Sequence, residues 1–315
     1  MGLNWHGVKF LAQARRSGVD FSRTITIGRL GLYTSIIQVQ QVLTSYGLPH
    51  GDVPVSPKYA ELIFKILGAH TVDSIDTSNY EDATIIADLN RPIPPELFET
   101  YDLVYDGGTI EHVFNVEQSL KNIMSLPKIG GRVIIHTMAN NFFGHGFYQF
   151  SPELFYRVFS KENGYVIERV IVHADFDFAQ WYEIPDPAEV HDRIELANNT
   201  DGLLLFVSAR RDTIVPLFEK PPQQSDYSAL WQGSLLGVNN SSSCATAKTP
   251  ASQSNRRNTL RASITAQFPW AGRLKRHIWW AMPTVPRLLN VIAGRRYRRQ
   301  KLSIERQKTK FRPVE

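Results

Sequence analysis

Two histidines stand where their side chains could act on a bound molecule. His112 follows Glu111 in the segment GTIEHVF, and His145 lies between two glycines in FFGHGFY. A histidine with a pKa near neutrality can take a proton from a hydroxyl group, so both are candidate catalytic residues. Equally, the Glu-His pair could cap the following helix, and His145 could anchor its loop. Further candidate hydrogen-bond acceptors are the aspartates Asp76, Asp88 and Asp106.

The runs that precede these candidates predict the sheet that positions them. Asp76, Asp88 and Asp106 each close a short β-rich run (HTVDSID, ATIIAD and YDLVYD), and His145 follows another run, RVIIHT. Such runs alternate with segments whose apolar residues have helical spacing. This alternation predicts an α/β fold with a largely parallel sheet and helices on both faces. Ligands of such sheets bind at the carboxyl ends of the strands. We predict strands over 24–28, 70–76, 83–88, 101–106, 132–137, 166–173 and 203–209, and helices over about 33–46, 56–68 and 116–125 and from 151 onward.

Three stretches of the sequence resemble class I S-adenosylmethionine-dependent methyltransferases. The first, YDLVYDGGTIEHVFNVEQSLKNIMSLPKIGGRVIIHT, has the hydrophobic strand, acidic end, EHV turn, helix and K-x-GG of that family. The other two, SNYEDATIIADLN and NNFFGHGFYQFSPELF, are similar to stretches of a methyltransferase-like group from bacterial surface-polysaccharide gene clusters. The resemblance covers about residues 20–210. It implies a Rossmann-like, three-layer α/β/α methyltransferase sheet.

The resemblance also implies a binding site for S-adenosylmethionine. The family's acidic residue at the end of the second strand, here Asp76, accepts hydrogen bonds from both ribose hydroxyls, and a carboxylate suits this because it only accepts. Asp88 would contact the adenine amino group. Asp106 and Gly107 would face the sulfonium, and Gly28 would lie beside the methionine end. Each aspartate could instead serve a local turn, and we expect no metal ion in the site.

The first loop, ITIGRLGLYTS, departs from the family's pattern. Thr26 stands where the family has an acidic residue, and Leu30 and Leu32 stand where it has glycines. Glycine allows a backbone to approach a ligand closely, whereas a leucine side chain would crowd that approach. The sequence therefore supports two readings of the domain. It is either an active methyltransferase or a non-catalytic, methyltransferase-like binding protein.

The charge of the chain is unevenly distributed. Residues 256–315 hold 16 Lys or Arg against two Glu, whereas the first 255 residues hold 19 against 28 acidic residues. We expect a methyltransferase domain over 1–215, a disordered linker rich in Pro, Gln, Ser and Asn over 216–267, and a basic, tryptophan-containing tail over 268–315. Trp279 and Trp280 among basic residues are typical of a segment that binds an anionic membrane surface or a partner protein. The tail has no recognisable nucleic-acid-binding module, so we do not expect nucleic acid as a partner.

Composition completes the functional prediction. The chain has a single cysteine, Cys244, and no run of about 18 apolar residues that could span a bilayer. We expect a cytoplasmic protein, held at the inner face of the membrane if the tail binds lipid. The predicted activity, which comes from the resemblance, is O-methylation of a sugar or glycan precursor, with His145 or His112 as the base. The alternative is a non-catalytic scaffold in a membrane-associated glycan assembly complex.

Overall fold

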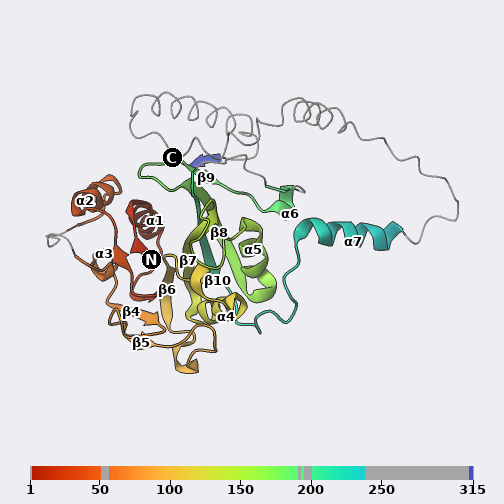
Figure 1. The fold of residues 1–315 in the computed structure, drawn as a ribbon, viewed down its shortest axis with the longest axis horizontal. Coiled ribbons are helices and arrows are strands. Elements are labelled where there is room, and N and C mark those ends of the chain that lie inside the picture. The colour runs from red at the N-terminus through yellow and green to blue at the C-terminus, as the bar shows by residue number, and fades with distance from the viewer. Residues whose placement is uncertain (1, 51–56, 191–192, 195–200, 238–311, 315) are drawn as a thin grey trace, which may run out of the picture. The chain divides into compact units, whose positions relative to one another are not determined.

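Nine strands within the described residues form one mixed sheet (Figure 1). The computed structural model describes residues 2–50, 57–190, 193–194, 201–237 and 312–314. The chain divides into two units, Met1–Trp231 with Arg306–Glu315, and Gln232–Glu305. The strand order is β11-β9-β8-β10-β7-β6-β2-β4-β5. In sequence order the strands are β2 (Arg23–Ile27), β4 (Thr71–Asp76), β5 (Ile85–Ile86), β6 (Tyr101–Asp106), β7 (Pro127–Asn140), β8 (Tyr165–Ala174), β9 (Trp181–Glu183), β10 (Leu203–Arg211) and β11 (Arg312–Val314).

The strand directions are those of a class I methyltransferase sheet. Strands β5, β4, β2, β6 and β7 are mutually parallel, and β10 runs antiparallel between β7 and β8. The chain order reverses at β2, which pairs with β4 on one side and β6 on the other. A reversal of this kind makes a crevice at the carboxyl ends of the strands, where such folds bind their ligands. The predicted fold class is confirmed.

Helices cover both faces of the sheet, which gives three layers (Figure 1). On β6, Leu103 and Tyr105 point into the core shared with the first three helices, whereas Val104 points into the core shared with α4 and α5. This alternation follows from the two-residue period of a strand and explains why the run YDLVYD is buried on both sides. The helices are α1 (Trp5–Arg16), α2 (Ile36–Ser45), α3 (Glu61–Ile66), α4 (Val116–Ser125), α5 (Pro152–Val158), α6 (Pro187–Val190) and α7 (Ser225–Gly237).

The N-terminal segment packs against the domain, which we did not predict. Helix α1 begins after Asn4, whose side chain accepts a hydrogen bond from Gly7 N at 3.0 Å. Before it, β1 (Gly2–Leu3) pairs in parallel with β3 (Gly31–Leu32), and Gly2 N donates to Gly107 O at 3.1 Å. The start of the chain therefore lies on the carboxyl edge of the sheet, next to the first loop.

Three histidines are buried where α1 packs on the sheet. His136 Nε2 lies 3.0 Å from His173 Nε2, and the ring of His6 stacks on that of His173 with centroids 4.0 Å apart. Trp181 Nε1 donates to His6 Nδ1, and His6 Nε2 lies 2.9 Å from Phe176 O. Burial lowers the pKa of all three imidazoles, so they are neutral at pH 7. They belong to the core.

Within the predicted linker, Ser225–Gly237 forms α7. Contacts that the composition does not show hold this helix: Arg193 pairs with Asp226, and the rings of Tyr227 and Trp231, four residues apart, stack at 6.0 Å. Residues 216–224 of the predicted linker are also described and form no helix or strand, whereas its residues 238–267 and all of the tail except β11 lie outside the described residues. The third predicted strand is also shorter than expected: β5 covers only Ile85–Ile86. No helix in the described part of the chain is long and apolar enough to cross a membrane.

Candidate functional site

Several predicted site residues meet at the carboxyl edge of β4, β2 and β6. Asp76 is the last residue of β4 and is half-buried. Gly28 directly follows β2, and its N–H donates to Ile75 O at 2.8 Å. Asp106 ends β6 and pairs across the sheet with Ile27. The edge therefore offers a carboxylate and main-chain groups on both sides of the reversal.

The carboxylate of Asp106 serves a turn. It accepts hydrogen bonds from Thr109 N at 2.8 Å and Ile110 N at 3.4 Å, and its side chain is fully buried. Burial first, and then the neighbouring Glu111, raise the pKa of Asp106 to about 8. In this structure Asp106 holds the 3-10 turn Ile110–His112, the turn-forming alternative that the sequence left open.

Asp88 also supports a turn. Its Oδ1 accepts hydrogen bonds from Asn90 N at 2.9 Å and Asn90 Nδ2 at 2.8 Å, and the guanidinium of Arg91 lies 3.8 Å from its other oxygen. These hydrogen bonds from Asn90 lower the pKa of Asp88. The residue follows β5 at the rim of the site, and its contacts are those of an Asx-turn.

Leu30 narrows the space beside the first loop, as the sequence predicted. It is only 2% exposed, and a β-carbon placed on Gly107 would lie 3.1 Å from Leu30 Cδ2. Thr26, in the place of the family's acidic residue, turns its hydroxyl to Gly28 O at 2.8 Å. The space over Gly107, where the sulfonium of the cofactor would lie, is bordered by Leu30, and Gly2 N donates to Gly107 O.

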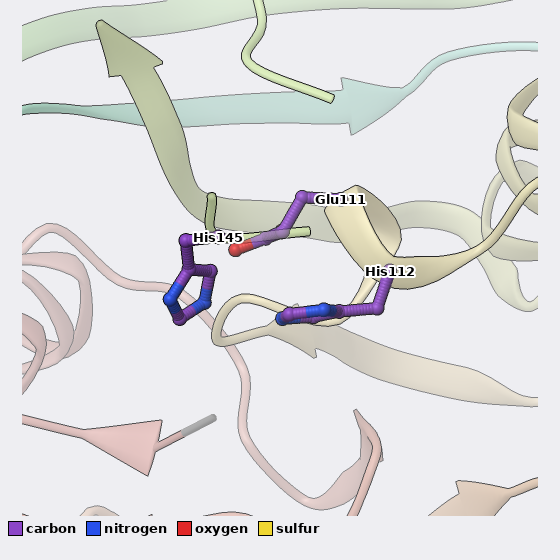
Figure 2. A group of neighbouring side chains, drawn as sticks. All are labelled: Glu111, His112 and His145. Atoms are coloured by element: carbon purple, nitrogen blue, oxygen red, sulfur yellow. The ribbon is translucent and has the colours of Figure 1, made fainter. Parts of the chain in front are cut away.

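A second group of side chains gathers beyond β6 and β7 on the same edge (Figure 2). It consists of Glu111, His112 and His145, each of which offers one atom within 4.8 Å of the atoms offered by the other two. The imidazole centroids of His112 and His145 are 4.9 Å apart, and both rings are exposed. Figure 2 shows the Glu111 carboxylate directed toward His145. The sequence placed both histidines on the ligand side of the sheet, and the structure brings them together.

Main-chain contacts fix the loop that carries His145. The backbone N–H groups of Phe147 and Tyr148 donate to Glu111 O at 2.7 and 3.2 Å. Gly146 packs so closely that an added β-carbon would lie 2.7 Å from the same oxygen, and its φ is +71°. Only glycine meets both conditions without strain. The loop is therefore docked on the turn Ile110–His112.

The group contains one buried carboxyl and a neutral imidazole. Burial first, and then the neighbouring His145, lower the pKa of His112. Burial raises the pKa of Glu111, whose Oε2 accepts a hydrogen bond from Thr137 Oγ1 at 2.9 Å. A neutral imidazole can take a proton from a hydroxyl group or bind a metal ion through its lone pair.

Glu111 is the site residue that sequence reasoning missed. Its position beside His112 suggested a helix cap, and nothing in the sequence shows that the side chain is buried under the loop of His145. Two other loop residues have local roles: Asn141 Nδ2 donates to Asp201 O at 2.9 Å, and Tyr148 Oη donates to Phe114 O at 2.6 Å.

Comparisons with solved structures find methyltransferases at low similarity. No family model matches the sequence, and no curated protein matches it. A putative methyltransferase from Bacillus halodurans is 11% identical, with a TM-score of 0.35, over 65% of this chain and 99% of that one. The Burkholderia thailandensis 1,6-didemethyltoxoflavin-N1-methyltransferase, solved with S-adenosylhomocysteine, is 9% identical, with a TM-score of 0.34, over 65% and 78%. A possible histamine N-methyltransferase from Thermotoga maritima is 14% identical, with a TM-score of 0.32, over 66% and 93%.

The Thermotoga protein is an S-adenosylmethionine-dependent methyltransferase, and the Burkholderia enzyme was solved with S-adenosylhomocysteine. At these identities and TM-scores the likeness carries no function to this chain.

Proposed function

We propose that this chain is an S-adenosylmethionine-dependent methyltransferase that O-methylates a sugar or glycan precursor in surface-polysaccharide biosynthesis. One observation carries the proposal. A sheet with the methyltransferase strand order brings Asp76, the backbone of Gly28, and the pair His112 and His145 to a single edge. The substrate class rests on the sequence resemblance.

The residues of this edge would divide the work between cofactor and acceptor. S-adenosylmethionine supplies an electrophilic methyl group when it is bound. Asp76, half-buried at the end of β4, is suited to accept hydrogen bonds from both ribose hydroxyls. His112 or His145 would take the proton from the acceptor hydroxyl as its oxygen forms the bond to the methyl carbon. The bond from that carbon to the sulfonium sulfur would break at the same time, with S-adenosylhomocysteine as the leaving group. Methyl transfer needs little more than this alignment and a base.

Calorimetry of the full chain with S-adenosylmethionine tests the proposal. We expect one molecule to bind, and Asp76→Ala to weaken binding by about tenfold or more, since hydrogen bonds to a carboxylate contribute about 1.5–3 kcal/mol. Asp212→Ala is the matched control, because Asp212 is exposed and lies beyond the far end of β10. Equal loss in both variants, or none in either, would contradict the assignment of Asp76.

The contact between Leu30 and Gly107 favours a second function, that of a non-catalytic binding protein. It fills the place where the family's glycine loop approaches the methionine end of the cofactor. The two functions separate in one comparison. If the chain is an active methyltransferase, the wild type binds S-adenosylmethionine. If it is a non-catalytic binding protein, only the Leu30→Ala variant, in which the space beside Gly107 is open, gains affinity for S-adenosylmethionine. Tight binding of S-adenosylmethionine by the wild-type chain, which contains Leu30, would rule out the second function.

We further propose that the basic segment binds an anionic membrane surface and so brings the domain to its substrate. Trp279 and Trp280, which lie outside the described residues, would insert at the headgroup level among arginines and lysines. Replacing both tryptophans by alanine in the full chain should reduce binding to anionic liposomes at low salt. Unchanged binding would point instead to a partner protein as the target of the segment.

A further inference from the structure

The carboxyl of Glu111 is buried with one oxygen left unsatisfied. Its side chain is 0% exposed, and Oε2 is satisfied by the hydroxyl of Thr137. Among the described residues, no hydrogen-bond partner reaches Oε1. A buried acceptor without a partner costs about 1–3 kcal/mol, and more when it is charged, so such an atom calls for a ligand.

The surroundings of the Glu111 carboxyl are those of a ligand set for a cation. The exposed rings of His112 and His145 lie next to the carboxylate, and the three candidate ligand atoms are within 4.8 Å of one another (Figure 2). In a tetrahedral zinc site the ligand atoms are about 3.4 Å apart. Metal binding would therefore require the two imidazoles to move closer to the carboxyl, and both residues are exposed.

We propose that Glu111, His112 and His145 bind a divalent transition-metal ion, with zinc as the best match. Two imidazole nitrogens and one carboxylate oxygen are a common protein ligand set for zinc, and this set leaves a coordination position open for an oxygen of a bound molecule. The ion would lie at the carboxyl edge of the sheet, on the side of β6 and β7.

The elements around the three residues already hold the ligands in place. Thr137 fixes the carboxylate through Oε2, which is the outer contact that orients a ligating group in metal sites. The docked loop holds His145 against the turn through Glu111 O.

Metal binding goes beyond the proposed methyltransferase function and does not depend on cofactor binding. A zinc-bound imidazole has no free lone pair, so His112 or His145 would act as the base only in the metal-free chain, and with zinc bound the open coordination position would take the acceptor oxygen and lower its pKa. The ion requires neither S-adenosylmethionine nor the crevice over Gly107. Titration of the full chain with metal alone therefore tests the inference, and titration with S-adenosylmethionine alone tests the function. Either result can fail while the other holds.

Zinc and cobalt are the probes. After treatment with a chelator, the full chain should bind one equivalent of Zn²⁺ by calorimetry, and Co²⁺ should give the visible absorption bands of a low-coordinate site. We expect His112→Ala and His145→Ala each to lower the Zn²⁺ affinity by about tenfold or more. Both side chains are exposed, so neither change should unfold the protein. His70→Ala, an exposed histidine at the start of β4, is the matched control.

Glu111→Gln completes the test, because the amide oxygen can still accept the hydrogen bond from Thr137 while the negative charge is lost. This variant should also bind Zn²⁺ more weakly and should lose the Co²⁺ bands. The proposal is overturned if the wild-type chain binds no stoichiometric Zn²⁺. It is equally overturned if the His112 and His145 variants bind as tightly as the His70 control, since the metal would then sit elsewhere.

Discussion

Low pH should destabilise the protein through its buried histidines. The contribution of His173 to the free energy of unfolding can be measured. Burial first, and then the neighbouring His6, lower the pKa of His173 from 6.5 to about 3. Its Nδ1 lies 2.9 Å from Ala174 O and its Nε2 faces His136, so a proton on Nε2 would break the second contact. Between pH 6.5 and 3 the unfolded chain binds a proton that the folded chain does not. The free energy of unfolding therefore falls as the pH falls through this range.

The size of the effect follows from the two pKa values. Lowering the pH from 6.5 to 4.5 should reduce the free energy of unfolding by about 2 kcal/mol through His173 alone. Asp106 acts in the opposite direction, because its pKa is raised to about 8 and the folded chain keeps a proton that the unfolded chain releases. A pH profile of the wild-type protein alone would mix the two.

Urea unfolding of the wild type and His173→Gln at pH 6.5, 5.5 and 4.5 separates them, because both proteins contain Asp106. The wild type should be the more stable at pH 6.5, and the difference should shrink by about 2 kcal/mol by pH 4.5. His70→Gln is the matched substitution outside the buried cluster. A difference that stays constant or widens as the pH falls would refute the reasoning.

Three further predictions concern the sheet edge. Leu30→Ala should lower the free energy of unfolding by about 2–5 kcal/mol, because it empties a buried site; urea unfolding measures this, and a loss below about 1 kcal/mol would mean that the loop is loosely packed. Asp106→Asn should reduce the loss of stability between pH 4 and 8, because it removes a carboxyl whose raised pKa makes deprotonation costly; an unchanged pH slope would contradict the burial of that charge. Gly146→Ala should weaken Zn²⁺ binding, because the added β-carbon would clash with Glu111 O. Gly144→Ala should not, because Gly144 also has a positive φ but its added β-carbon would have no atom within 4 Å. Equal effects of the two changes in calorimetry would show that the docked loop does not contribute to Zn²⁺ binding.

The sequence predicted the elements whose pattern is local. The strand Tyr101–Asp106 and the helix Val116–Ser125 have the predicted bounds, because a β-rich run that closes on Asp106 and two glycines, and a helical repeat, are both local patterns. Helix α1 was not predicted. His6 and Gly7 interrupt the apolar pattern at its start, and its apolar face packs against the sheet, which is not a local feature of the sequence. Strand β11 has three residues including a proline, and its pairing with β9 joins positions far apart in the chain.

The sequence predicted only those site residues that follow directly from the ends of strands. The positions of Asp76, His112 and His145 on one edge follow from the parallel sheet, whatever the packing of individual side chains. The burial of Glu111 does not, because it depends on a loop from beyond β7 that folds back over the turn. The turn-forming role of Asp106 likewise depends on two backbone N–H groups that no residue spacing identifies.

Strand β11 has a consequence for the integrity of the chain. Residues 306–315 belong to the same unit as Met1–Trp231, so the intervening segment, Gln232–Glu305, leaves that unit and returns to it. The connection keeps β11 at a high local concentration near β9, whose backbone it pairs at three positions. A single protease cut between 238 and 311 would remove that advantage and leave three residue pairs to hold the strand. If β11 then dissociated, β9 would become an open edge with unpaired backbone groups, and cleaved molecules could associate through it.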